Sequence, residues 1–147
     1  MKHYPLMLLL AAGMLTASCA TTNRAVSYRE ARNYFFRNDV KQPTELLIIH
    51  SQAELEQYFG ETAFMGKGGE PTKIDFSKQF VVAKVLPVTN HLTNISLQRI
   101  EHSGDKHLTL VWYIAVNDTP QSYSMQPMKL VVLNKKYEGY RVSEKEE

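Results

Sequence analysis

Cysteine 19 is the only thiol in the chain, and it stands at a sharp change in composition. Lys2 and His3 come first, an apolar run follows over residues 6–14, and small residues lead up to Cys19. A charged start, a short apolar stretch and small residues form the layout of a secretory signal. The sequence therefore predicts a signal peptide over residues 1–18. A cysteine at its end is a nucleophile placed for modification.

The five residues Leu15, Thr16, Ala17, Ser18 and Cys19 resemble the lipobox of bacterial lipoproteins. This resemblance implies that the Cys19 thiol receives a diacylglycerol thioether and that cleavage then makes Cys19 the lipidated first residue. Three acyl chains are expected on such a cysteine, and two are already enough for a stable anchor. With no acidic residue just after Cys19, we expect attachment to the bacterial outer membrane on its periplasmic side.

Catalytic arrangements are much harder to find. Ser77 is followed by Lys78, but no G-x-S-x-G motif occurs. Asp75 and Asp118 lie where strands or loops end, and aspartate readily bonds its own nearby backbone, so they are expected to stabilise turns.

Histidines are the other candidate groups: His50, His91, His102 and His107. None has the H-E-x-x-H or C-x-x-C spacing that makes a zinc site specific. His102 and His107 flank a turn at Gly104, where solvent-exposed rings are expected. We therefore expect a non-catalytic protein without metal or cofactor, and a small envelope hydrolase or metal-binding protein is the alternative.

The length and the net charge of the chain limit the number of domains and the kinds of partner to be expected. Removal of 18 of the 147 residues leaves 129, which fits one domain. The net charge of +2 falls to +1 when Lys2 leaves, and the charges are interspersed. Nucleic-acid binding proteins carry basic patches or stripes, so nucleic acid is not expected as a partner.

The sequence of the first half of the mature chain predicts a tether, two strands and a helix. Residues 19–27 have no apolar period, so a tether is expected there, followed by a single β-rich domain over residues 28–142. Strands are expected in the second half of 28–38 and over 44–50. Ser51 and Glu54 form a capping box that predicts a helix over residues 51–59, which Gly60 would end in a left-handed conformation. The glycine-rich residues 64–71 predict a flexible turn.

The second half predicts strands over residues 80–86, 93–101, 107–116 and 128–134, and residues 140–142 would close a hairpin before an acidic tail at 143–147. The fold class is α+β and β-dominated, with about six or seven mostly antiparallel strands forming a sandwich or a partly open barrel. The side chains expected in the core alternate along two of these strands: Val81, Ala83, Val85, Leu108, Leu110, Trp112 and Ile114.

Residues 74–83, with the helix before them and the strands after them, resemble the C-terminal domain of PrcB-type protease-complex subunits. Uncharacterised bacterial envelope lipoproteins of that type are more similar still, through Met65-Gly66, Pro71-Thr72 and Gln121-Ser122-Tyr123. The similarity covers about residues 34–142. It implies a non-catalytic envelope lipoprotein that acts as an accessory or binding module, with an extracytoplasmic protease or its assembly as the candidate partner.

Two polar loops, 87–94 and 117–127, would leave the sheet from the same end if the strands run up, down and up. Exposed aromatic and methionine side chains on a rigid scaffold are typical recognition groups. We expect a partner-binding surface there, and the alternative is that Tyr123 folds back to plug the barrel mouth. The residues of the predicted surface are Asn90, His91, Gln121, Tyr123 and Met125.

Overall fold

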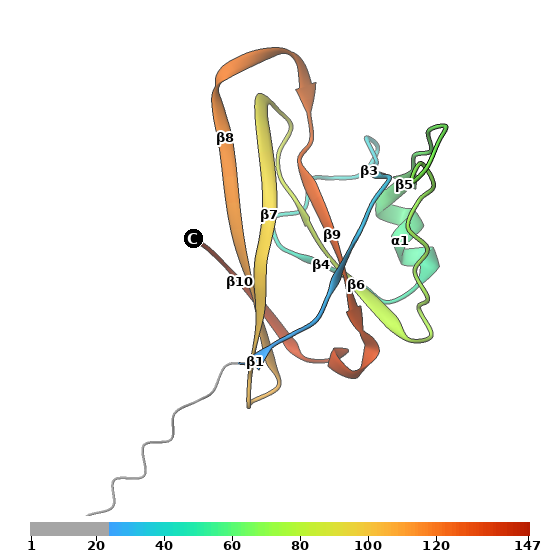
Figure 1. Cartoon of the computed structure of the whole chain (residues 1–147), viewed down its shortest axis with the longest axis vertical. Coiled ribbons are helices and arrows are strands. Elements are labelled where there is room, and N and C mark those ends of the chain that lie inside the picture. Colours follow the sequence, from blue (N-terminus) through green and yellow to red (C-terminus); the bar gives the residue numbers. More distant parts are fainter. Residues whose placement is uncertain (1–23) are drawn as a thin grey trace, which may run out of the picture.

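A computed structural model describes residues 24–147, which form two four-stranded β-sheets, a two-stranded sheet and one α-helix (Figure 1). The predicted signal peptide and the lipid attachment residue Cys19 lie outside the described residues. The first sheet has the order β1 (Arg24–Ala25), β7 (Thr89–Ser103), β8 (His107–Met125) and β10 (Arg141–Glu146). The second has the order β2 (Arg29–Ala31), β9 (Met128–Asn134), β6 (Gln79–Val85) and β4 (Leu47–Ile49).

The two four-stranded sheets pack on each other through one apolar core. Phe80, Val82 and Val131 contribute from the second sheet, and Leu110 and Trp112 contribute from the first. Sheets that face each other in this way form a sandwich, and here they do not close into a barrel. The predicted fold class is confirmed, with the sandwich as its form.

A second core covers the other face of the β6 sheet. Val81, Ala83 and Val85 point there, against Leu55 of α1 (Gln52–Tyr58) and Phe36 of β3 (Tyr34–Phe36). β3 pairs with β5 (Phe59–Glu61) as a small outer sheet. β6 is therefore buried on both faces, which explains its continuous apolar sequence. The predicted core residues are buried apart from Ile114, which is partly exposed.

The helix begins as predicted and ends differently. The backbone N–H of Glu54 donates to Ser51 Oγ at 3.2 Å, and the Glu54 carboxylate accepts from the N–H of His50 at 2.6 Å. Gly60 does not adopt a left-handed conformation, because the chain passes directly from α1 into β5 and pairs with Phe35. An extended C-cap at Phe59 ends the helix instead.

The C-terminal residues form a strand rather than a hairpin and a solvated tail. β10 pairs in parallel with β8, from Arg141 beside His107 to Glu146 beside Trp112. The reason lies in Lys84, which is only 9% exposed and whose Nζ atom lies 2.7 Å from Glu144 Oε2 and 3.8 Å from Glu146 Oε1. A buried ammonium needs anionic partners, so the predicted acidic tail at 143–147 supplies them.

Residues 24–26 of the predicted tether at 19–27 belong to the folded domain. Arg24 and Ala25 form β1 against His102 and Glu101 of β7, and Val26 is buried in the sandwich core. A single apolar residue, Val26, among polar ones is too short a pattern to predict a strand from the sequence. The chain therefore enters the domain beside the turn that joins β7 to β8.

Candidate protein-binding surface

The two predicted loops form the far end of a long β-hairpin. β7 begins at Thr89 and β8 continues to Met125, and these two residues face each other. Further pairs join His91 to Pro120 and Thr93 to Val116. The prediction of loops at 87–94 and 117–127 was wrong, because most residues of both segments belong to β7 and β8. Their polar sequences lack the apolar alternation from which a strand is predicted. Polar strands can pair with each other in solvent, since pairing satisfies the backbone without burying side chains.

This hairpin extends beyond the sheet that covers its inner face. Trp112 and Val116 lie four residues apart along β8, yet Trp112 is fully buried whereas Val116 is 57% exposed. β6 and β9 end their pairing at Val85 and Met128. We call residues 89–96 of β7 and 113–125 of β8 the distal hairpin. It lies at the end of the sandwich opposite the point where the chain enters at β1 (Figure 1).

Local hydrogen bonds hold an irregular segment of the distal hairpin. Residues 117–119 stand opposite Leu92, so the two strands are out of step there. His91 Nδ1 lies 2.8 Å from the carbonyl oxygen of Asn117, and the N–H of Thr119 donates to Asn117 Oδ1 at 2.8 Å. The Thr93 hydroxyl donates to the carbonyl oxygen of His91 at 3.0 Å. His91 thus orders the backbone of this segment.

The structure places the five predicted site residues on the distal hairpin. The side chains of these residues differ in how far they are exposed. Asn90 and Tyr123 are exposed, whereas His91, Gln121 and Met125 are partly buried. Tyr123 is 55% exposed, so its ring does not plug the sandwich.

Other exposed apolar side chains on or next to the distal hairpin were not predicted: Val88 at 63%, Leu92 at 47%, Tyr113 at 51% and Val116 at 57% exposed. Alternation along β8 places Val116 on the same face as the buried Trp112, but Val116 is exposed. The missing information was the length of the opposing sheet. With Tyr123, they bring to five the exposed apolar side chains on or next to the distal hairpin, and Tyr113 and Val116 lie on opposite faces of it.

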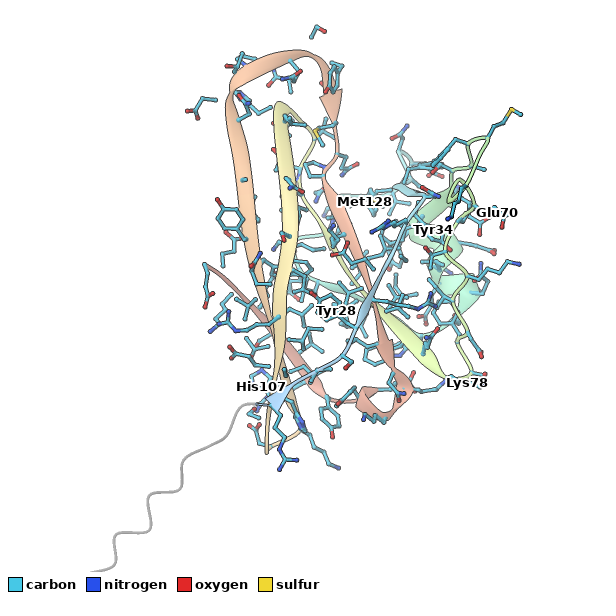
Figure 2. The ribbon with its side chains drawn as sticks, in the orientation of Figure 1. Tyr28, Tyr34, Glu70, Lys78, His107 and Met128 are labelled. Atoms are coloured by element: carbon cyan, nitrogen blue, oxygen red, sulfur yellow. The ribbon has the colours of Figure 1, made fainter. Side chains whose placement is uncertain are left out.

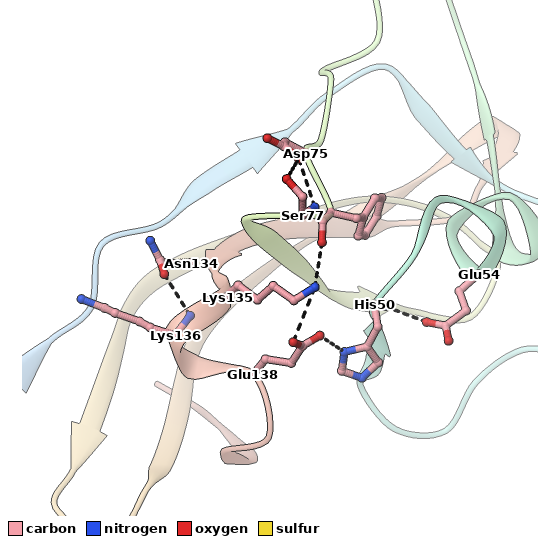
Figure 3. A network of polar contacts seen from close by, with 9 residues as sticks. His50, Glu54, Asp75, Ser77, Asn134, Lys135, Lys136 and Glu138 are labelled. Atoms are coloured by element: carbon pink, nitrogen blue, oxygen red, sulfur yellow. Dashed lines mark hydrogen bonds and ion pairs between the residues drawn. The ribbon is translucent and has the colours of Figure 1, made fainter.

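The serine candidate has a structural role. Ser77 Oγ donates to Asp75 Oδ1 at 2.5 Å, and the Ser77 N–H donates to the same oxygen at 3.0 Å. The bond from the Ser77 hydroxyl, followed by the bond from its N–H, lowers the pKa of Asp75 below its ordinary value. Figure 3 shows His50 beside Glu138 rather than beside Ser77, with 2.8 Å between His50 Nδ1 and Glu138 Oε1. Asp75 therefore closes a turn, as predicted.

The histidines at the Gly104 turn are packed rather than fully exposed. The His102 ring contacts the rings of Tyr137 and Tyr140, with centroids 5.8 and 5.3 Å apart. His107 lies at the same end of the molecule (Figure 2), and its Nε2 atom is 2.7 Å from Ser143 Oγ. The expectation of exposed rings was wrong because β10 and the turn before it cover them.

A polar cleft of about 490 Å³ lies elsewhere, between α1 and residues 70–74. Tyr34, Gln52 and Glu61 line it, and the Tyr34 hydroxyl donates to the carbonyl oxygen of Thr72 at 2.7 Å. Burial, then the neighbouring Glu61, raises the pKa of Tyr34 above its ordinary value. Across residues 24–147, no group of three or more His, Cys, Asp or Glu side chains could hold a metal ion.

No family model, curated protein or solved structure matches this chain. The resemblance to PrcB-type domains therefore stays a prediction. Among the described residues, no helix is long and apolar enough to cross a bilayer.

Proposed function

We propose that this protein is a lipid-anchored, non-catalytic accessory module of the bacterial cell envelope, which binds a protein partner through its distal hairpin. Cys19 carries the lipid and attaches the protein to the outer membrane on its periplasmic side. The candidate partner is an extracytoplasmic protease or its assembly. A small hydrolase or metal protein is the alternative, but the turn formed by Ser77 and Asp75 offers it no support.

The observation that carries this proposal is the set of exposed apolar side chains at the far end of the hairpin. Leu92, Val116 and Tyr123 stand in solvent on strands whose other ends are fixed in the sandwich core. Apolar and aromatic groups held in place lose little conformational entropy on binding, which favours their use in recognition.

The arrangement of the two ends supports a tethered role. The chain reaches β1 only five residues after Cys19, beside His102, whereas Thr89 and Met125 pair at the other end of the hairpin. A lipid at Cys19 would hold the β1 end towards the bilayer and leave the distal hairpin directed towards partners.

A photo-reactive amino acid at position 123 tests the proposed surface in the native envelope. We expect one dominant adduct with a partner protein on irradiation of intact cells. Gln57, which is exposed on α1, gives the matched control position. Equal adducts from both positions, or an adduct from position 57 only, would place the contact elsewhere.

For the anchor, we expect Cys19→Ala to leave the membrane fraction or to accumulate as an uncleaved precursor. Each buried CH₂ of an acyl chain contributes about 0.8 kcal/mol, and a domain whose net charge is near zero has no strong attraction to the membrane surface that could replace that contribution. Cell fractionation followed by mass measurement of the N-terminal peptide checks this. Unchanged processing and membrane retention would refute lipidation at Cys19.

A further inference from the structure

The outer edge of β7 is open along the distal hairpin. On that side, β1 pairs only with Glu101 and His102, and the N–H of Val26 donates to the carbonyl oxygen of Ile100 at 3.0 Å. The chain then leaves this sheet for β2 in the opposite one (Figure 1). From residue 89 to residue 97, no strand within residues 24–147 pairs with this edge of β7.

A hydrogen bond from Tyr28 shows which backbone groups of β7 point away from β8. The Tyr28 hydroxyl donates to the carbonyl oxygen of Leu97 at 2.8 Å, from the side on which β1 lies (Figure 2). Backbone groups of successive residues in an antiparallel strand point alternately to opposite neighbours. Because pairing with β8 is regular from Thr93 to Leu97, the backbone groups of Thr93 and Ile95 point to the open side as well. Tyr28 thus supplies a donor that a neighbouring strand would otherwise supply.

The regular stretch of this edge lacks the charged residues and prolines that usually protect an edge against strand pairing. Natural proteins protect open edges with charged residues, prolines and bulges. Residues 88–98 contain neither a charged residue nor a proline, and a regular stretch of β7 runs from Thr93 to Leu97. The opposite edge of the hairpin carries Asp118, Pro120 and the irregular residues 117–119. The charged residue and the proline therefore lie on the β8 edge, and the β7 edge has only the register shifts on either side of residues 93–97.

We propose that the β7 edge at residues 93–96, next to the Leu97 carbonyl that Tyr28 already satisfies, takes up an extended segment of a partner protein as an added β-strand. This inference rests on the proposed function, and it specifies the kind of partner segment that would bind. The side chains of Ile95 and Leu97 point to the core, whereas Asn94 is exposed on the outer face. An added strand continues both faces, so its side chains alternate between apolar and uncharged polar.

A flexible segment suits this edge better than a second folded copy of the chain. Register shifts occur on both sides of the stretch, between His91 and Thr93 and between Leu97 and Arg99. Bulges bend a strand, so a rigid copy would meet only a few residues. Such a contact falls short of the roughly 1,000 Å² that stable interfaces between folded proteins bury. An extended segment follows the bend and gains main-chain hydrogen bonds.

Amide hydrogen exchange measures this directly. The full mature protein in detergent micelles is titrated with a blocked, uncharged peptide of about eight alternating Val and Thr residues. We expect the amides of Thr93 and Ile95 to exchange about tenfold more slowly with peptide, whereas those of Asn94 and Ser96, which face β8, stay unchanged. The double variant Asn94→Lys with Ser96→Lys should abolish the slowing, and Gln57→Lys adds charge away from the edge as the control.

Unchanged exchange at Thr93 and Ile95 in the unsubstituted protein would overturn the proposal. So would slowing that persists in the double lysine variant, if its amide spectrum shows the native fold. Slowing that grows with protein concentration in the absence of peptide would assign the edge to a second copy of the chain. None of these outcomes involves Tyr123, so the photo-adduct at that position reports separately on the proposed function.

Discussion

Trp112 shows how a single residue links the hairpin to the sandwich. Its side chain is fully buried among residues of both sheets, and within residues 24–147 its Nε1 atom has no hydrogen-bond partner. The Lys84 ammonium lies 5.8 Å from the ring centroid, and its charge interacts favourably with the ring face. The apolar body of Trp112 therefore stabilises the fold enough to tolerate one unpaired donor.

At this scale we predict that Trp112→Ala lowers the free energy of unfolding by about 3 to 5 kcal/mol, because it leaves a large cavity between the sheets. Its neighbour Tyr113 points to the opposite face and is 51% exposed, so Tyr113→Ala should change that free energy by less than about 0.5 kcal/mol. Urea unfolding of both variants checks this. Similar losses in the two variants would contradict the assignment of faces along β8.

Sequence reasoning worked best for residues whose environment is set locally or by simple alternation. Ser51 and Asp75 stabilise their turns through hydrogen bonds to residues two or three positions away, and both were predicted. Lys84 could not be understood in this way, since its anionic partners lie 60 residues or more along the chain. The burial of a charged residue depends on tertiary partners, which one sequence does not reveal.

At the scale of elements, β10 is a structural strand and not a tail. Its pairing with β8 covers the edge of the hairpin near Trp112, and its carboxylates neutralise Lys84. Four of the five residues at 143–147 are charged, so the sequence predicted an acidic tail there and not a strand. The distal hairpin was missed for a related reason, because its polar residues make a strand only when they pair with each other.

We predict that deletion of residues 143–147 destabilises the domain by about 3 kcal/mol or more, because Lys84 then stays buried without a carboxylate partner. The thermal midpoint should fall by several degrees or more. The double variant Glu144→Gln with Glu146→Gln keeps the strand and removes both carboxylates, so it should show much of the loss. A deletion without effect on the melting curve would mean that these residues are a solvated tail.

At the scale of the whole molecule, stability should depend on pH through carboxylates at the surface. The hydrogen bond from Arg99 lowers the pKa of Glu147 below its ordinary 4.5, and the bond from the Ser103 hydroxyl lowers the pKa of Asp105 below 3.8. A lowered pKa in the folded state means that ionisation favours folding. This stabilisation is complete above about pH 4.5 and is lost as the pH falls through the lowered values.

We therefore expect the thermal midpoint to stay level from neutral pH to about 4.5 and to fall continuously towards about pH 3. Arg99→Gln removes the strongest of these partners, with 2.6 Å between Arg99 Nη2 and Glu147 Oε1, so it should make the acid loss smaller. Thermal melts across this range test both statements. A midpoint that rises on acidification would reverse the sign and contradict the assigned hydrogen bonds.

The proposed binding surface is tested by removing the recognition side chains of the distal hairpin while keeping its fold. In the lipidated protein, Tyr123→Ser with Met125→Ser should abolish capture of the partner from the envelope, with a nearly unchanged thermal midpoint. Gln57→Ser on α1 is the matched control and should capture as much partner as the unsubstituted protein. If the double variant instead melts several degrees earlier and captures the same amount per folded molecule, the hairpin end is structural and the proposed binding surface is wrong.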